Sequence, residues 1–160
     1  MPLIPLAGLE TIVPLFRGLH AFHARELSQR YHTHGSDADY LDFVRGRVDT
    51  GSWVFARAGS WGPEGYLLAS PTVTSGDFLS HPRRYVTLEH LYVVPHARGA
   101  GIGAALITEM EQKMRAENHD VWMVGFNAFN TEAERFYAGQ GAQPHGGFRS
   151  KRISISAPAE

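Results

Sequence analysis

Apolar residues recur at helical spacing in the first third of the chain. Over residues 9–31 they fall at mixed intervals of three and four, which favours a first helix. Residues 32–39 are mostly polar and turn-forming. Ser36 or Asp37 in this segment is expected to cap a second helix that runs to about Val48.

The period then changes from helical to extended. Residues 52–59 and 64–73 flank a Gly/Pro turn and predict two strands. A polar, Pro-containing loop over 74–84 leads to a third strand at 85–94, which is rich in β-branched and aromatic residues and ends at Pro95. Because this loop borders the third strand, it is a candidate lid over a substrate.

Helix and strand alternate in the second half of the chain. Three elements are expected there: an amphipathic helix over 101–118, a short apolar strand over 121–126, and a helix over 130–141 capped by Asn130 or Thr131. Residues 148–156 alternate enough to predict a last strand. The order of elements predicts an α/β fold, a mixed central β-sheet flanked by helices, in one domain over 1–160.

Composition narrows the classes of function. The formal net charge of −1 gives no electrostatic case for nucleic acid or an anionic membrane. The chain has no cysteine, and its nine histidines form no strong metal-binding pattern, so we expect no metal. Its start lacks a basic n-region, and no apolar run approaches the roughly 18 residues of a membrane span. We therefore expect a soluble cytoplasmic protein.

The most informative segment is the turn between the third strand and the long helix. Gly99, Gly101 and Gly103 lie there, directly after Arg98. The free N–H groups of a helix's first turn form an anion site, and glycines let the backbone approach a diphosphate closely. Arginine adds a positive charge whose fork geometry suits phosphate oxygens.

Three interpretations of this turn compete. It can be a tight turn that binds nothing. It also formally matches a dinucleotide fingerprint, but the next strand ends without the acid that would hold a ribose. A P-loop is excluded because no Gly-Lys-Ser/Thr follows. The third interpretation is a resemblance to a known family.

Two motifs carry that resemblance. The string Leu91-Tyr-Val93-Val-Pro95-His-Ala-Arg98-Gly99-Ala100-Gly101-Ile102-Gly103 resembles the acetyl-CoA signature of the GNAT acetyltransferase superfamily, LxVxPxxRGxGIG. The string Asn130-x-x-Ala133-x-x-Phe136-Tyr137-x-x-x-Gly141 resembles its second signature. The two motifs lie within about residues 84–142. The resemblance implies a GNAT-type domain in which splayed strands form an acetyl-CoA cleft.

The resemblance also implies which residues hold acetyl-CoA. The backbone around Leu91 and Val93 would pair with the pantetheine arm. The diphosphate would lie on the turn formed by Arg98, Gly99, Ala100, Gly101, Ile102 and Gly103. Asn130 would reach the cofactor from the second motif, and a plain helix cap is an equally good interpretation of this residue.

Catalytic roles follow from the same comparison. Tyr137 matches the tyrosine that protonates the departing thiolate, with simple core packing as the alternative. The strand around Glu89 resembles that of diamine acetyltransferases, in which a glutamate helps to receive the proton of the amine. Alternation places His90 on the opposite face from Glu89. His90 stands where those enzymes have aspartate, and is a weak substrate candidate, a proton relay or a satisfied half-buried histidine.

The implied activity is acetyl-CoA-dependent transfer to a primary amine, favouring a small molecule, through a ternary complex without a metal. A protein or peptide amine is an alternative acceptor, and a non-catalytic CoA-binding sensor is an alternative of another class. A polycationic acceptor is disfavoured, since Asp37, Asp39 and Asp77 are the only further acids considered near the site. Dimers are common in the superfamily, so a homodimer is a candidate assembly.

Overall fold

The computed structural model describes residues 4, 6–60, 62–147 and 149–151 of the chain. Two compact units are present, Met1–Gly125 and Phe126–Glu160. The first unit contains η1 (Leu6–Ile12), α1 (Val13–Glu26), α2 (Asp37–Asp49), β1 (Trp53–Gly59), β2 (Gly62–Thr74), β3 (Arg83–Val93), η2 (Pro95–Ala97), α3 (Ile102–Ala116) and β4 (Val121–Val124). The second unit contains α4 (Thr131–Gly139).

These elements follow the predicted order, with differences at the two ends of the chain. The first predicted helix begins as a 3-10 helix, and the α-helix starts only at Val13, with Pro14 in its first turn. Proline is favoured there because a first-turn N–H has no helical partner to lose. The predicted strand over 148–156 falls largely outside the described residues, and residues 149–151 are not in a strand.

Ser36 rather than Asp37 caps α2. Its hydroxyl accepts a hydrogen bond from the Asp39 N–H at 3.2 Å, and the Asp39 carboxylate accepts one from the Ser36 N–H at 2.7 Å. This reciprocal capping box satisfies two N–H groups at the start of the helix. It fixes the beginning of the helix whose last turn carries Arg47.

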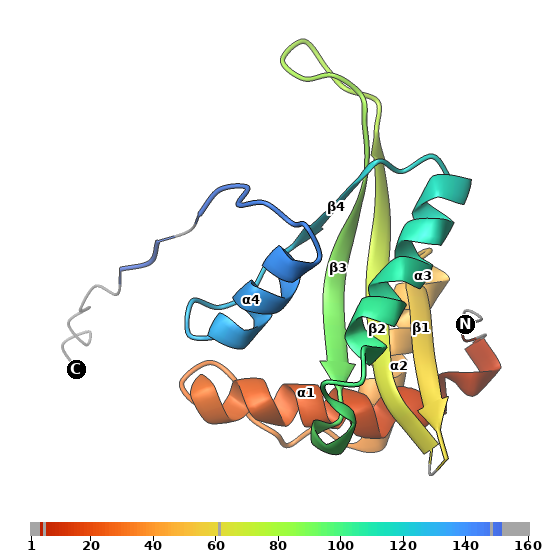
Figure 1. Ribbon diagram of the computed structural model, residues 1–160, viewed down its shortest axis with the longest axis vertical. Coiled ribbons are helices and arrows are strands. Elements are labelled where there is room, and N and C mark those ends of the chain that lie inside the picture. Colours follow the sequence, from red (N-terminus) through yellow and green to blue (C-terminus); the bar gives the residue numbers. More distant parts are fainter. Residues whose placement is uncertain (1–3, 5, 61, 148, 152–160) are drawn as a thin grey trace, which may run out of the picture. The chain divides into compact units, whose positions relative to one another are not determined.

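The four strands form one mixed sheet in the order β1-β2-β3-β4 (Figure 1). β1, β2 and β3 are antiparallel neighbours, and β4 runs parallel to β3 after the α3 crossover. β4 pairs with β3 only from Tyr85↔Val121 to Leu88↔Val124. β4 ends at Val124, opposite Leu88, so residues 89–93 of β3 have no paired strand on that side. The predicted mixed sheet is confirmed.

A β-bulge interrupts β3 at Glu89. Leu68 of β2 faces His90, and the next residue, Ala69, faces Leu88, so Glu89 is the extra residue. A bulge breaks the alternation of side chains between the two faces of a sheet. The prediction that Glu89 and His90 lie on opposite faces is therefore wrong: Glu89 contacts Arg47, and His90 stacks on Phe43, both from α2.

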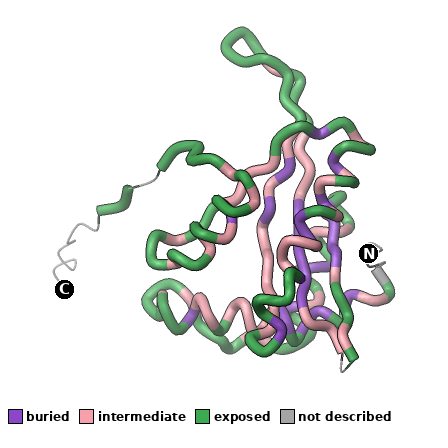
Figure 2. Tube along the Cα trace, in the orientation of Figure 1, coloured by how far each residue is buried: buried purple, intermediate pink, exposed green. Residues whose placement is uncertain are grey.

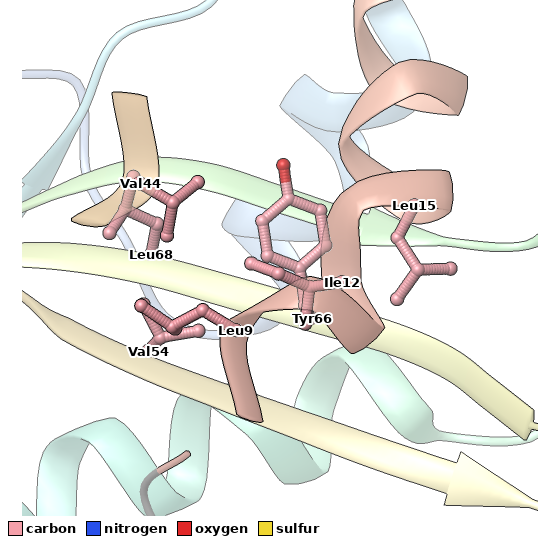
Figure 3. Packing of buried hydrophobic residues seen from close by; sticks show 7 residues of the cluster. All are labelled: Leu9, Ile12, Leu15, Val44, Val54, Tyr66 and Leu68. Carbon is pink, nitrogen blue, oxygen red and sulfur yellow. The ribbon is translucent and has the colours of Figure 1, made fainter. Parts of the chain in front are cut away.

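Helices cover both faces of the sheet. α3 packs on one face, while η1, α1 and α2 cover the other (Figures 1 and 3). Figure 2 shows buried positions along the middle of the sheet and on the helix sides that face it. The cluster drawn in Figure 3 joins η1, α1 and α2 to β1 and β2. Its members are Leu9, Ile12, Leu15, Val44, Val54, Tyr66 and Leu68.

The loop between β2 and β3 lies at the end of β3 away from Glu89. The Asp77 carboxylate holds its turn by accepting hydrogen bonds from the backbone N–H groups of Leu79 and Ser80. From Arg83 to Glu89 an extended strand spans about 20 Å. This separation removes the reason for the predicted lid over the acceptor.

Leu68→Ala is expected to lower the free energy of unfolding by about 2–5 kcal/mol, because Leu68 is fully buried and truncation leaves a cavity. Urea unfolding at pH 7 measures the change. Leu79→Ala at the β2–β3 loop is the matched control, since Leu79 is 81% exposed and should change stability by no more than about 0.5 kcal/mol. Equal losses in the two variants would contradict the described packing.

Candidate active site

The bulge residue Glu89 lies in a polar network between the sheet and α2. Its Oε1 atom accepts a hydrogen bond from the Ser70 hydroxyl at 2.5 Å and forms an ion pair with the Arg47 guanidinium. Arg47 also donates to the Ser70 hydroxyl at 3.3 Å, and Ser52 and Ser70 share a hydrogen bond of 2.6 Å. The Glu89 side chain is 18% exposed, so this carboxylate is held in place and still reachable from solvent.

Sequence reasoning missed Arg47 and Ser70. Neither residue belongs to a motif, and arginine in the last turn of a helix is commonly a response to the helix dipole. Their contact with Glu89 depends on how α2 packs on the sheet and on the bulge. The sequence contained no signal for either feature.

His90 is enclosed by aromatic rings on the same face. Its Nδ1 lies 3.0 Å from the Tyr66 hydroxyl, and its ring centroid lies 4.6 Å from that of Phe16. Burial, and then the positive charges of His23, Arg47 and His20, lower the pKa of His90 to about 4. The imidazole is therefore neutral at pH 7. This state fits a satisfied half-buried histidine and also the neutral form that a proton relay needs.

The pKa of His90 makes stability depend on pH. The folded-state value of about 4 lies below the ordinary 6.5, so the unfolded chain binds more protons between these values. The free energy of unfolding should fall by about 2 kcal/mol from pH 7 to pH 4.5 through this residue. Urea unfolding at both pH values should show a smaller fall in His90→Gln than in the wild type. The exposed His34→Gln variant should keep the wild-type fall, and an unchanged fall in His90→Gln would contradict the assignment.

Two glycines shape the backbone of the turn before α3. Gly99 and Gly101 both have φ of +78°, a conformation that side chains other than glycine rarely adopt. A Cβ atom added at either glycine would meet nothing within 4 Å. The first helical bond of α3 runs from Ala105 N–H to Gly101 C=O at 3.0 Å, so the earlier N–H groups lie outside the helical pattern. An open cradle of N–H groups fits a diphosphate.

Arg98 lies beside this cradle. It is exposed, and its Nε–H donates to the Val93 carbonyl at 3.1 Å. This bond anchors the guanidinium between the end of β3 and the glycines. It also occupies the carbonyl oxygen of Val93, one of the backbone groups expected to pair with pantetheine.

The second unit contains Asn130 and Tyr137. The side-chain Oδ1 atom of Asn130 accepts a hydrogen bond from the Ala133 N–H at 3.0 Å, so Asn130 rather than Thr131 caps α4. Tyr137 is buried, and its ring stacks on Phe126 with centroids 5.8 Å apart. Burial raises the pKa of Tyr137 to about 12, so its phenol keeps a proton at neutral pH.

The three aspartates considered as further acceptor ligands make other bonds. Asp37 pairs with Arg17, Asp39 belongs to the α2 capping box, and Asp77 holds the β2–β3 loop. In the part of the chain that the structure describes, no three His, Asp or Glu side chains form a possible metal site. Among the same residues, none of the helices has the length and apolar character needed to cross a membrane.

Comparison with protein families decides the identity. The model of the acetyltransferase (GNAT) family matches residues 17–142, which is most of the chain. The chain belongs to the GNAT family of acetyltransferases. The resemblance seen in the sequence is confirmed, and the chain is an N-acetyltransferase of this family. No curated protein matches the sequence.

Solved structures share the GNAT fold at low sequence identity. A tetramutant of the BH1408 protein from Bacillus halodurans has a TM-score of 0.85 at 18% identity, covering 95% of this chain and 98% of that one. A ribosomal-protein-alanine N-acetyltransferase from Brucella melitensis has a TM-score of 0.71 at 16% identity, covering 95% and 98%. An aminoglycoside acetyltransferase from an uncultured soil metagenomic sample has a TM-score of 0.68 at 15% identity, covering 97% of this chain and 95% of that one. These similarities concern the fold.

Proposed function

We propose that this GNAT enzyme transfers an acetyl group from acetyl-CoA to a primary amine of a small molecule, directly and within a ternary complex. The observation that carries the proposal is the continuity of β3 with the glycine turn. One strand bears a reachable carboxylate, then an edge left open by β4, and then a cradle of backbone N–H groups. Acid–base chemistry and diphosphate binding are thereby available along a single element.

Acetyl-CoA would lie along this element. The open edge around Leu91 offers backbone groups to the two amides of a pantetheine arm. The Gly99–Gly103 backbone and the Arg98 guanidinium would hold the diphosphate. α3 has no acidic residue in its first turn, so nothing there opposes an anion.

The chemistry needs proton transfers at the nitrogen and at the sulfur atom. A primary amine resembling lysine has a pKa near 10.4 and reaches the enzyme as an ammonium ion. Glu89 would accept one proton, directly or through water, and the free amine would attack the thioester carbonyl carbon. As the C–S bond of the tetrahedral intermediate breaks, Tyr137 would give its phenolic proton to the leaving thiolate, and the nitrogen would lose its second proton to water, which returns one to the phenolate. The products are a neutral amide and the thiol of CoA.

Gly101→Val is expected to raise the dissociation constant of acetyl-CoA at least tenfold, measured by isothermal titration calorimetry. The substitution places a β-branched residue at φ of +78° and puts a side chain into the open space before α3. Gly51→Val is the matched control, because Gly51 has φ of +98°, also faces open space and lies in the turn between α2 and β1. It should lose stability while keeping acetyl-CoA affinity. Unchanged binding by Gly101→Val would remove the diphosphate site from this turn.

A further inference from the structure

The charge balance around Glu89 limits which amines can bind there. Arg47 pairs with Glu89, and its side chain is 39% exposed. The Nε atom of Arg47 is buried and, among the described residues, has no hydrogen-bond partner. Glu89 and Ser70 are therefore the partners on which the guanidinium depends.

An ammonium ion that binds Glu89 would share this one carboxylate with the Arg47 guanidinium, which already pairs with its Oε1 atom. If the amine carries only positive charge, two cations then face a single anion. The repulsion between the two cations opposes such binding. Asp37 and Asp39 lie at the other end of α2 from Arg47, where Asp37 pairs with Arg17 and Asp39 belongs to the capping box.

An amine that also carries a carboxylate avoids this repulsion. Its ammonium group would pair with Glu89, and its carboxylate would pair with the Arg47 guanidinium. The ion pair between Arg47 and Glu89 would thus be replaced by two ion pairs with the substrate. A guanidinium binds a carboxylate through two parallel hydrogen bonds, which fixes orientation as well as charge. The exchange would also turn the ammonium towards the carboxylate that removes its proton.

We propose that the acceptor is a zwitterion of the amino acid type, with a carboxylate beside its primary amine, and that Arg47 selects it. This inference rests on the proposed function and names the acceptor class of the same site. Phe43 lies one helical turn before Arg47 on α2, is 47% exposed and stacks on His90. It offers an apolar surface beside the charges, so leucine and phenylalanine are suitable probes.

The test compares each amino acid with analogues that lack its carboxylate, and with a polyamine. Thiol release from acetyl-CoA gives kcat/KM for leucine and phenylalanine, for their amides, for 3-methylbutylamine and 2-phenylethylamine, and for spermidine. We expect the two amino acids to exceed each of the others at least tenfold. Arg47→Met should remove the preference by raising KM for the amino acids tenfold or more, with the amides changed by less than about twofold.

Arg45→Met is the matched control, because Arg45 lies on the same helix and pairs with Asp42 instead; it should keep the preference. The inference is overturned if amides, simple amines or spermidine react as well as the amino acids, or if Arg47→Met slows all acceptors equally. It is also overturned if the enzyme binds acetyl-CoA and acetylates neither amino acid. If any small-molecule amine is acetylated in those cases, the proposed function still holds. If the wild-type protein does not bind acetyl-CoA, both the proposed function and this inference are refuted.

Discussion

Tyr137→Phe is expected to lower kcat by about 10²–10³-fold, with the dissociation constant of acetyl-CoA within about twofold of the wild type. The substitution keeps the ring that stacks on Phe126 and removes only the hydroxyl group. Because burial raises the pKa of Tyr137 to about 12, the wild-type phenol carries its proton at every pH used for the assay. Without that proton the thiolate must leave as an anion or take a proton from water.

Thiol release at saturating acetyl-CoA and acceptor measures the effect, and calorimetry measures binding separately. Tyr85→Phe is the matched control, since Tyr85 lies on β3 four residues before Glu89 and has no proposed role. Its kcat should stay within about twofold. A Tyr137→Phe enzyme with wild-type kcat would assign this side chain to packing alone.

Glu89→Gln is expected to lower kcat/KM for the acceptor by about 10²-fold at pH 7. Glutamine keeps the shape of the side chain and can still accept a hydrogen bond from Ser70, but it cannot remove a proton from an ammonium ion. The variant must therefore use the fraction of acceptor that is already deprotonated. Its kcat/KM should rise about tenfold per pH unit below the pKa of the amine.

Glu117→Gln provides the comparison, because Glu117 is also a carboxylate paired with a cation, Lys113, at i,i+4 spacing on α3. It should change kcat/KM by less than about twofold and stability by no more than about 1 kcal/mol. A Glu89→Gln enzyme that shows a small effect, or the same pH profile as the wild type, contradicts the role of Glu89 as proton acceptor.

Local patterns predicted the order of the elements for physical reasons. α2 begins at a clear capping residue, α3 has strong helical periodicity, and β3 ends two residues before Pro95. Gly99 and Gly101 have positive φ in the turn before α3, a backbone that glycine adopts without steric cost. The helical spacing along α3 places Met110 and Met114 in the core.

The part that could not be predicted depends on pairing between distant segments. The bulge at Glu89 exists because β2 and β3 pair in two registers, one on each side of that residue. Alternation along β3 alone assumes a single register and therefore separated Glu89 from His90. Arg47 and Glu89 are 42 positions apart in the sequence, and they meet only because α2 packs on the face of the sheet that carries Glu89. The predicted cytoplasmic location, the homodimer and the single domain over 1–160 stay predictions.

The most direct test of the central claim is to incubate the protein with acetyl-CoA and a panel of amino acids, simple amines and peptides. Free thiol would be followed together with the mass of each acceptor. We expect thiol release that depends on an acceptor, with one acetyl group added to a small-molecule amine for each thiol released. Binding of acetyl-CoA without acetylation of any amine would contradict it and favour a non-catalytic CoA-binding module.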